Sequence, residues 1–308
     1  MGGPFCIAPA WVLGKCRLMD IKAILMGLAF AAMWSSAFTS ARIIVEFAPP
    51  LTALAFRFLV SGLIGVAIAR AFGQSFRLSR RQWVGVLIFG VCQNAIYLGL
   101  NFVAMQTIEA SLAAIIASTM PLLVALVGWL LMGQRMRPLG IAGLVAGVIG
   151  VTLIMGARLQ GGVDMYGIIL CAIAVVSLTI ATLAVMGASS GGNVLMIVGL
   201  QMLVGSAMLW GPALVIETFD VTWNWQLIVA FIYTTLVPGL LATWVWFLLV
   251  GRIGAVKAST FHFLNPFLGV ATAAALLGEK LESVDVIGVV IIAGGILAVQ
   301  LSKQPTIR

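Results

Sequence analysis

The sequence predicts an all-α membrane protein of ten transmembrane helices, arranged as two inverted five-helix repeats with both termini cytoplasmic. Three observations lead to this fold class: the composition, the lengths of the apolar segments, and a match between the two halves of the chain. Of 308 residues, 62% are hydrophobic and only 8% are charged, and the mean hydropathy is +1.18. A soluble domain carries about 25% charged residues, so this chain requires lipid as its solvent.

Ten apolar segments follow one another along the chain, separated by polar or turn-forming residues. At a rise of 1.5 Å per residue, about 20 residues span a hydrocarbon core of roughly 30 Å. Helices satisfy every backbone group within lipid, and the sequence shows no strand-like alternation. The predicted helices cover residues 21–45, 51–72, 82–105, 107–132, 138–157, 164–187, 193–216, 225–250, 255–277 and 283–302.

Lysine and arginine residues collect on one side of this arrangement. With the N-terminus inside, thirteen of them are cytoplasmic, whereas only Arg42, Arg158 and Lys280 lie outside. The positive-inside rule therefore places both termini in the cytoplasm. The net charge of +8 is spread over short loops, so it indicates orientation rather than nucleic-acid binding. We expect Arg57, inside the second helix, to snorkel toward the interface or to pair near Glu46.

The two halves of the chain match at a constant spacing. Residues 102–121 align with residues 247–266 at an offset of 145, and the same offset pairs Gly143 with Gly288 and Gly150 with Gly295. At an offset of 144, Phe56-Arg57 is matched by Leu200-Gln201. A match through two helices and a loop indicates an internal repeat.

The repeat has a geometric consequence. Because each half contains an odd number of helices, the second half enters the membrane from the opposite side. Inverted repeats of this kind are typical of transporters that bind their substrate near the membrane midplane. The predicted organisation is a tail (1–20), a first repeat (21–157), a second, inverted repeat (164–302) and a C-terminal tail (303–308).

The sequence resembles the EamA type of the drug/metabolite transporter superfamily over residues 21–302. The features that carry the resemblance are the tandem repeat, Trp34-Ser35-Ser36-Ala37-Phe38 in the first helix, Pro121 before Gly133-Gln134-Arg135, and Asn265-Pro266 before Gly278-Glu279-Lys280. Gln134 stands where the family often shows glutamate. Within the superfamily the chain is most similar to YddG-type amino-acid exporters. The resemblance implies a central cavity lined by the first, third, fourth, sixth, eighth and ninth helices.

Polar and aromatic residues near the middle of these helices are the candidate cavity residues. Gln93, Tyr97 and Asn101 recur every four residues and form one stripe, which either lines a cavity or joins helices by hydrogen bonds. His262, the single histidine, could bind a carboxylate, relay protons or pack as a neutral residue. The predicted substrate-binding residues are Trp34, Ser35, Gln93, Tyr97, Asn101, Ser118, Ser177, Thr179, Trp244, Ser259, His262 and Asn265.

Prolines and glycines mark two further features of the helices. Pro121, Pro238 and Pro266 fall within predicted helices, where each removes a backbone donor, so they are candidate hinges or static kinks. The helices over 138–157 and 283–302 carry several glycines and almost no polar side chains. We expect these two helices to pack closely and to act as scaffold.

These features predict a secondary transporter that exports amino acids, aromatic and other neutral ones, across the inner membrane by alternating access around a central cavity. Export rather than import rests on the resemblance. The absence of a carboxylate at any helix centre favours facilitated diffusion over acid-based proton exchange. The alternatives are an exporter of drugs, purines or other small metabolites, or a passive channel.

The sequence predicts no enzymatic activity. It contains no phosphate-binding loop, HExxH motif or nucleophile elbow, so we expect no cofactor and no metal. The expected partners are a small-molecule substrate, amino acids above all, and the lipid bilayer, with no nucleic acid. The oligomeric state stays open, a monomer included.

Overall fold

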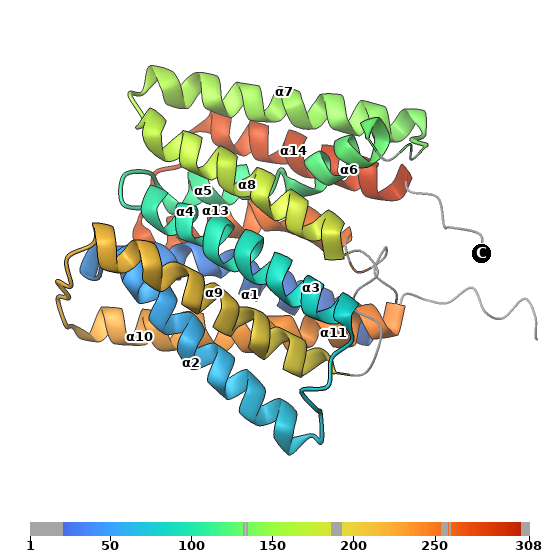
Figure 1. Ribbon diagram of the computed structural model, residues 1–308. Helices are drawn as coiled ribbons and strands as arrows, with labels where there is room; N and C mark the ends of the chain where they lie inside the picture. Colours follow the sequence, from blue (N-terminus) through green and yellow to red (C-terminus); the bar gives the residue numbers. More distant parts are fainter. Residues whose placement is uncertain are drawn as a thin grey trace, which may run out of the picture.

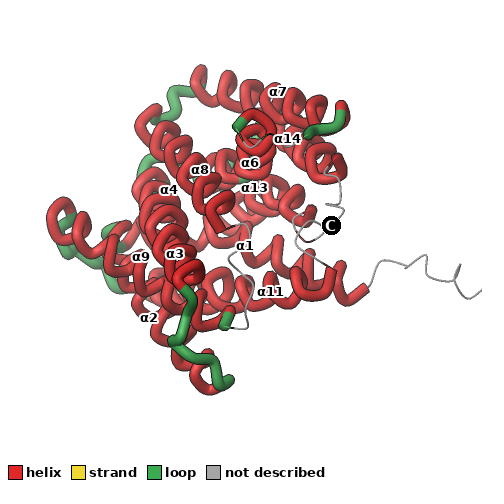
Figure 2. The backbone as a smooth tube through the Cα atoms, turned by 45° about the vertical axis from the view of Figure 1, so that its right-hand side comes forward, coloured by secondary structure: helices red, strands yellow, loops and turns green. Residues whose placement is uncertain are grey.

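The structure is a computed structural model that describes residues 21–131, 133, 135–185, 193–253, 258 and 260–302. Over these residues it is helical, without strands, and the long helices run along a common direction (Figures 1 and 2). Nine helical stretches in this part of the chain are long and apolar enough to cross a membrane, and Phe261–Leu277 is a shorter apolar helix. The predicted fold class, an all-α membrane protein built as two five-helix repeats, is confirmed.

Each repeat forms five passes, several of which are built from more than one helical segment. The first repeat comprises α1 (Ile21–Phe47), α2 (Pro50–Ala71), α3 (Arg80–Phe89), η2 (Gly90–Tyr97), α4 (Leu98–Ala104), α5 (Ala110–Ala117), α6 (Met120–Leu130) and α7 (Pro138–Gln160). The second comprises α8 (Met165–Val185), α9 (Val194–Ile216), α10 (Trp225–Thr234), η3 (Thr235–Leu241), α11 (Ala242–Ile253), η4 (Thr260–Leu264), α13 (Asn265–Leu277) and α14 (Ser283–Ser302). The segments η2 and η3 are π-helical, and η4 is a 3₁₀-helix.

The two ends of the helical bundle are best named from α1. The near end is where α1 begins at Ile21, and the far end is where α1 ends at Phe47 and α2 begins at Pro50. Because successive passes alternate in direction, the connections 105–109, 161–164, 217–224 and 278–282 also lie at the far end. Side-chain contacts between these connections and neighbouring helix starts agree with this placement.

The two repeats share the same irregularities at matched positions. The π-helical segments Gly90–Tyr97 and Thr235–Leu241 begin 145 residues apart. Pro121 and Pro266, also 145 residues apart, each stand at the start of a helix after a break in the fourth pass of their repeat. Departures from a regular helix depend on local detail, so finding them in both halves shows that the repeat extends to the backbone.

Glycines bring α7 and α14 into close contact, as predicted. A Cβ atom added to Gly143 would lie 2.6 Å from the carbonyl oxygen of Gly295, and one added to Gly288 would lie 3.1 Å from that of Gly150. The offset of 145 residues converts Gly143 into Gly288 and Gly150 into Gly295. Each contact is therefore the image of the other, which is the relation that a two-fold axis between α7 and α14 produces.

The prolines lie in two different settings. Pro121 and Pro266 are in the first turns of α6 and α13, where the missing N–H costs no intrahelical hydrogen bond. Pro238 lies inside η3. The interpretation of a proline in the interior of a helix therefore holds for Pro238 and is wrong for the other two, because the chain breaks before them. A hinge role for any of the three stays a prediction.

Candidate functional site

A central cavity lies between α1, α2, η2, α4 and η3, near the middle of the bundle. It is lined by Trp34, Ala37, Phe38, Ala41, Arg57, Tyr97, Leu98, Asn101, Phe102, Met105 and Pro238. Its volume of about 50 Å³ exceeds the roughly 10–15 Å³ that one water molecule needs. It is far below the roughly 300 Å³ at which small-molecule pockets begin. In this conformation the cavity is too small to hold an amino acid.

Three predicted substrate-binding residues meet at this cavity. Trp34 belongs to a stripe of α1, and Tyr97 and Asn101 extend along the third pass of the first repeat. Tyr97 is 1% exposed and Asn101 2%. Asn101 donates its Nδ2 to the Tyr97 carbonyl oxygen at 2.7 Å, and its Oδ1 accepts from the Cys171 thiol at 3.4 Å. Within the described residues the Tyr97 hydroxyl makes no hydrogen bond, so it can bond a molecule in the cavity.

The predicted stripe of Gln93, Tyr97 and Asn101 is interrupted at Gln93. Gln93 lies inside η2, is half-buried, and is not among the residues that line the cavity. A π turn contains an additional residue, so positions four apart no longer share a face. Its neighbour Asn94 instead donates its Nδ2 to the Gln201 carbonyl oxygen at 2.9 Å, which joins η2 to α9.

The predicted hydroxyl groups bond to backbone carbonyls rather than facing the cavity. Ser118 donates to the Ala114 carbonyl at 2.6 Å and Thr179 to the Val175 carbonyl at 2.8 Å, both within their own helices. Ser177 donates to the Cys92 carbonyl at 2.8 Å and so joins α8 to η2. These three contacts are structural in this conformation.

His262, Asn265 and Ser35 form a separate group beside the cavity, at the level of Phe30 to Ser35 of α1. The His262 ring lies against Phe30, with centroids 5.4 Å apart, and against Trp246 at 5.3 Å. Its Nδ1 is 3.0 Å from Asn265 Nδ2, and the Ser35 hydroxyl donates to the Asn265 carbonyl at 3.3 Å. None of the three lines the cavity. Phe30, which packs against the His262 ring, links the group to the cavity wall, because its ring also lies 5.8 Å from that of Trp34.

The two remaining candidates lie elsewhere. Trp244 is 49% exposed and lines neither cavity described here. It follows η3, and the additional residue in a π turn rotates every later position relative to a regular helix. Ser259 lies outside the described residues.

Arg57 lines the central cavity, which corrects the expectation that it snorkels or pairs near Glu46. Its exposed fraction is 5%, and Glu46 pairs with Arg42 at 3.5 Å instead. The guanidinium lies over the Phe58 ring, 5.1 Å from its centroid. The expectation failed because a long cationic side chain near a helix end usually reaches water. The match of Arg57 to polar Gln201 in the second repeat was the sequence signal for an interior position.

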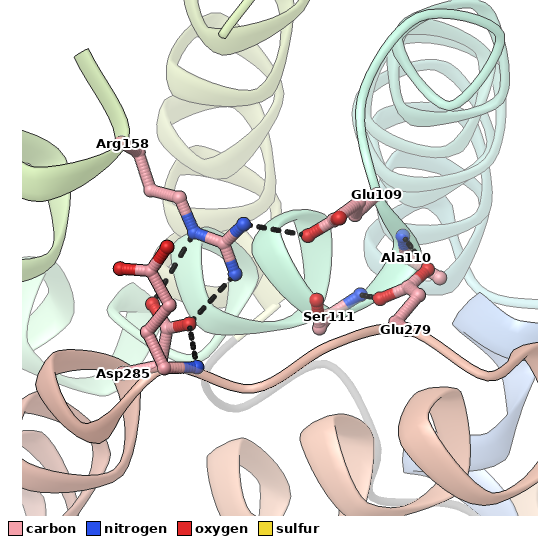
Figure 3. Close-up of polar contacts among 7 residues, drawn as sticks. Glu109, Ala110, Ser111, Arg158, Glu279 and Asp285 are labelled. Atoms are coloured by element: carbon pink, nitrogen blue, oxygen red, sulfur yellow. Dashed lines mark hydrogen bonds and ion pairs between the residues drawn. The ribbon is translucent and has the colours of Figure 1, made fainter. Parts of the chain in front are cut away.

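Ionic contacts tie the two repeats together at the far end (Figure 3). Arg158 of α7 donates Nη1 to Glu109 at 2.7 Å, and donates Nη2 and Nε to the two carboxylate oxygens of Asp285 at 2.8 and 3.2 Å. Glu279 accepts from the backbone N–H groups of Ala110 and Ser111 at 2.8 and 3.0 Å. The Arg158–Asp285 pair and the Glu279 hydrogen bonds join the first repeat to the α13–α14 region, whereas the Arg158–Glu109 pair lies within the first repeat.

A second carboxylate of the C-terminal repeat caps the N-terminus of α2 in the first repeat. Glu217, after α9, accepts from the backbone N–H groups of Leu51 and Thr52 at 2.7 and 2.8 Å. A carboxylate is favourable at a helix N-terminus because the N–H groups there are unpaired and the dipole is positive. The second repeat thus supplies carboxylate caps for both α2 and α5.

The connection between the repeats also carries a stabilised carboxylate. Hydrogen bonds from the Thr107 side chain and the Tyr166 backbone lower the pKa of Asp164 below its ordinary value. The Tyr166 and Gly167 N–H groups donate to Asp164 at 3.1 and 3.3 Å, at the start of α8. Carboxylates therefore gather at the far end, whereas Lys and Arg concentrate at the near end.

A larger groove opens beside α1 at the far end. It has a volume of about 620 Å³ and is lined by Ser36, Thr39, Ser40, Arg42, Ile43, Glu46, Phe47, Glu109, Trp225, Gln226, Val229, Ala230, Tyr233, Leu276, Leu277 and Glu279. At its deep end the hydroxyl oxygens of Ser36 and Tyr233 are 2.7 Å apart and join α1 to α10. The groove and the central cavity lie on different faces of α1.

Two inverted five-helix repeats around a largely apolar cavity with a few polar side chains define a multi-pass membrane transporter of small molecules. The sequence agrees with this class. The chain belongs to the EamA-like transporter family, whose sequence profile matches residues 21–156 and 165–301. Members of this family are membrane transporters, not enzymes.

Several relatives share most of the chain. The uncharacterized transporter YvbV of Bacillus subtilis is 26% identical over 90% of this chain and 91% of its own. A probable amino-acid metabolite efflux pump of Salmonella typhimurium is 24% identical over 90% of this chain and 94% of its own. The aromatic amino acid exporter YddG of Ancylobacter novellus is 30% identical, but over only 46% of this chain and 48% of its own.

One solved crystal structure has the same fold. It superposes with a TM-score of 0.66, covers 92% of this chain and 99% of its own, and is 21% identical. At that identity the likeness concerns the fold alone.

Proposed function

We propose that this transporter exports amino acids, aromatic and other neutral ones, across the inner membrane. The observation that carries the proposal is the central cavity, where the aromatic rings of Trp34 and Tyr97 lie beside the polar groups of Tyr97 and Asn101. Such a wall accepts an apolar or aromatic side chain and hydrogen-bonds the polar end of the same molecule. The names of two relatives, an amino acid exporter and an amino-acid efflux pump, support the same substrate class.

The mechanism that we propose is rocking of the two repeats around the cavity. Because the cavity in this conformation is smaller than an amino acid, the repeats must separate for a substrate to enter. Contacts between repeats exist at both ends: Phe30 with Trp246 and His262 toward the near end, and Arg158 with Asp285 at the far end. In the proposed cycle these two sets of contacts open in alternation.

The proposed energy source is the substrate gradient. The lining of the central cavity, within the described residues, contains no carboxylate, and a proton-coupled carrier usually places an acid in its pathway. The proposed orientation has both termini in the cytoplasm and the far end outside, because Lys and Arg concentrate at the near end.

Uptake into proteoliposomes tests the proposal. We expect saturable uptake of labelled phenylalanine or leucine that unlabelled amino acid trapped inside accelerates, and no response to a pH gradient. Tyr97→Ala is expected to lower uptake about 10-fold or more, because it removes both ring and hydroxyl from the cavity wall. Tyr166→Ala, which removes an exposed tyrosine at the far end, is the matched control and should leave uptake unchanged.

Three other results would change the proposal. If well-reconstituted protein carries none of the amino acids, the substrate class is rejected, and purines and lipophilic cations are the next panel. Flux that does not saturate and shows no counterflow indicates a passive channel. Uptake that follows the pH gradient and is lost in His262→Gln indicates proton coupling.

A further inference from the structure

Arg57 is a buried cation without a counter-ion. Its side chain forms no ion pair with any acid in the described part of the chain, and its Nε atom is buried with no hydrogen-bond partner. Its guanidinium lies over the ring of Phe58, 5.1 Å from the centroid. Burying an unpaired charge is costly in any protein and more so within a membrane.

Two other arginines of the described part of the chain, unlike Arg57, are neutralised by acidic side chains. Arg158 lies between two carboxylates, and Arg42 pairs with Glu46 four residues along the same helix. Arg57 has no such arrangement, and what borders its guanidinium is the central cavity. The counter-ion of Arg57 is therefore expected to be an anion that enters the central cavity.

The π-helical segment η3, whose Pro238 lines the cavity, passes close to the guanidinium of Arg57. A Cβ atom added to Gly239 would lie 3.5 Å from Arg57 Nη2, at ordinary van der Waals distance, so the glycine leaves no side chain against the guanidinium there. In the first repeat, the matched position of Gly239 is Asn94, which is bonded to α9. In the second repeat, the matched position of Arg57 is neutral Gln201. Among the described residues that line the cavity, Arg57 is the one cation, and it belongs to the first repeat.

We propose that Arg57 binds the carboxylate of the transported molecule, so that the substrates are small carboxylates with an apolar or aromatic side chain. This inference rests on the proposed function and narrows it, because amines and lipophilic cations without a carboxylate are excluded. The planar guanidinium can donate two parallel hydrogen bonds to a carboxylate. The Phe58 ring lies 5.1 Å from the guanidinium carbon, and Tyr97, whose hydroxyl can also donate, lines the same cavity.

The first arm of the test uses the unmodified protein and two matched ligand pairs. Binding to purified protein in detergent is measured by ligand-induced thermal stabilisation for phenylalanine against phenylalaninamide, and for 3-phenylpropionate against 3-phenylpropanamide. Each pair differs only in carboxylate against carboxamide. We expect the carboxylate of each pair to bind at least ~10-fold more tightly, as a charge-assisted pair in a buried site requires.

The second arm uses variants of α2. Arg57→Gln is expected to lose ~10–100-fold in affinity for both carboxylates and little for the amides, and Arg57→Lys to retain an intermediate affinity. Arg70→Gln removes the same charge from the exposed end of the same helix and should bind like the unmodified protein. The ligand pairs give a result even if Arg57→Gln fails to fold.

The outcomes separate this inference from the amino-acid proposal. Equal affinity for acid and amide in the unmodified protein, or full carboxylate affinity in a folded Arg57→Gln, would overturn the carboxylate site. If proteoliposomes carry no amino acid but 3-phenylpropionate still binds in an Arg57-dependent way, the amino-acid assignment fails and the carboxylate site stands. Arg57-dependent binding together with amino-acid counterflow supports both.

Discussion

The two repeats have the same backbone plan but present different side chains to the central cavity. The first repeat places Arg57, Tyr97 and Asn101 there, whereas the residues matched to Tyr97 and Asn101 in the second repeat are Ala242 and Trp246. The contribution of the second repeat to the wall is Pro238. Matched backbones allow two equivalent arrangements of the halves, while unmatched side chains fix one chemistry and one orientation for the ligand. The shared backbone plan therefore concerns how the two halves move, whereas the differing side chains concern which ligand is bound.

Breaking the ionic contact between the repeats is the change with the largest expected effect. Arg158→Met leaves the Asp285 side chain, which is 2% exposed, without its counter-ion, so we expect a loss of about 3–5 kcal/mol in the free energy of unfolding. Thermal and chemical unfolding in detergent measure it. Arg70→Met removes a cation from the last turn of another helix, so it controls for the helix-dipole contribution and should cost less than about 1 kcal/mol.

A double variant shows whether the loss comes from the unpaired acid. Arg158→Met combined with Asp285→Leu replaces the pair by apolar groups, and this is expected to recover most of the stability. If Arg158→Met is no more destabilising than Arg70→Met, the far-end contact does not hold the repeats together.

Substitutions at matched glycines sharpen the comparison of the halves. Gly143→Ala places a Cβ 2.6 Å from the Gly295 backbone carbonyl, and Gly288→Ala places one 2.4 Å from Cγ1 of Ile154, a fully buried β-branched side chain. We therefore expect each substitution to cost about 1–3 kcal/mol in the same unfolding measurement. Gly294→Ala, which meets nothing within 4 Å, should be neutral or slightly stabilising. Equal losses at Gly143 and Gly294 would contradict the close packing of α7 and α14.

Replacing the matched prolines is expected to have the smallest effect. Pro121→Ala and Pro266→Ala change a first-turn position in each repeat, so each should lower stability by only about 0.4–1 kcal/mol, through the freer unfolded chain. Proteoliposome uptake should change little if the breaks before these residues are set by tertiary packing. A gain of about 3 kcal/mol in either variant would instead indicate relief of a mid-helix proline.

The spans and the repeat were predictable from the sequence because both depend on strong, long-range signals. Apolar segments of about 20 residues fix where helices run, and the offset of 145 residues already linked Pro121 to Pro266 and Gly143 to Gly288. The observed bounds accordingly differ from the predicted ones by a few residues. The apolar pattern did not predict that the fourth and ninth passes are each broken into two helical segments.

The candidate site was only partly predictable. Trp34, Tyr97 and Asn101 line a common cavity, although their substrate roles stay predictions. Gln93 and Trp244 were assigned to faces on the assumption of regular helices, and the π-helical segments beside them change the phase. Arg57 was missed because general rules send a lone cation toward water. Its burial depends on how α2 packs against other passes, which no local pattern contains.

The carboxylate caps at the far end have a consequence for the order of biosynthesis. Ribosomes release the chain from its N-terminus, so α2 and α5 enter the membrane before Glu217 and Glu279 have been made. Until the second repeat has been synthesised, the first N–H groups of α2 and α5 hydrogen-bond to water at the membrane surface. The first repeat therefore completes its own helix starts only after translation of the second, which makes the halves unequal partners in assembly.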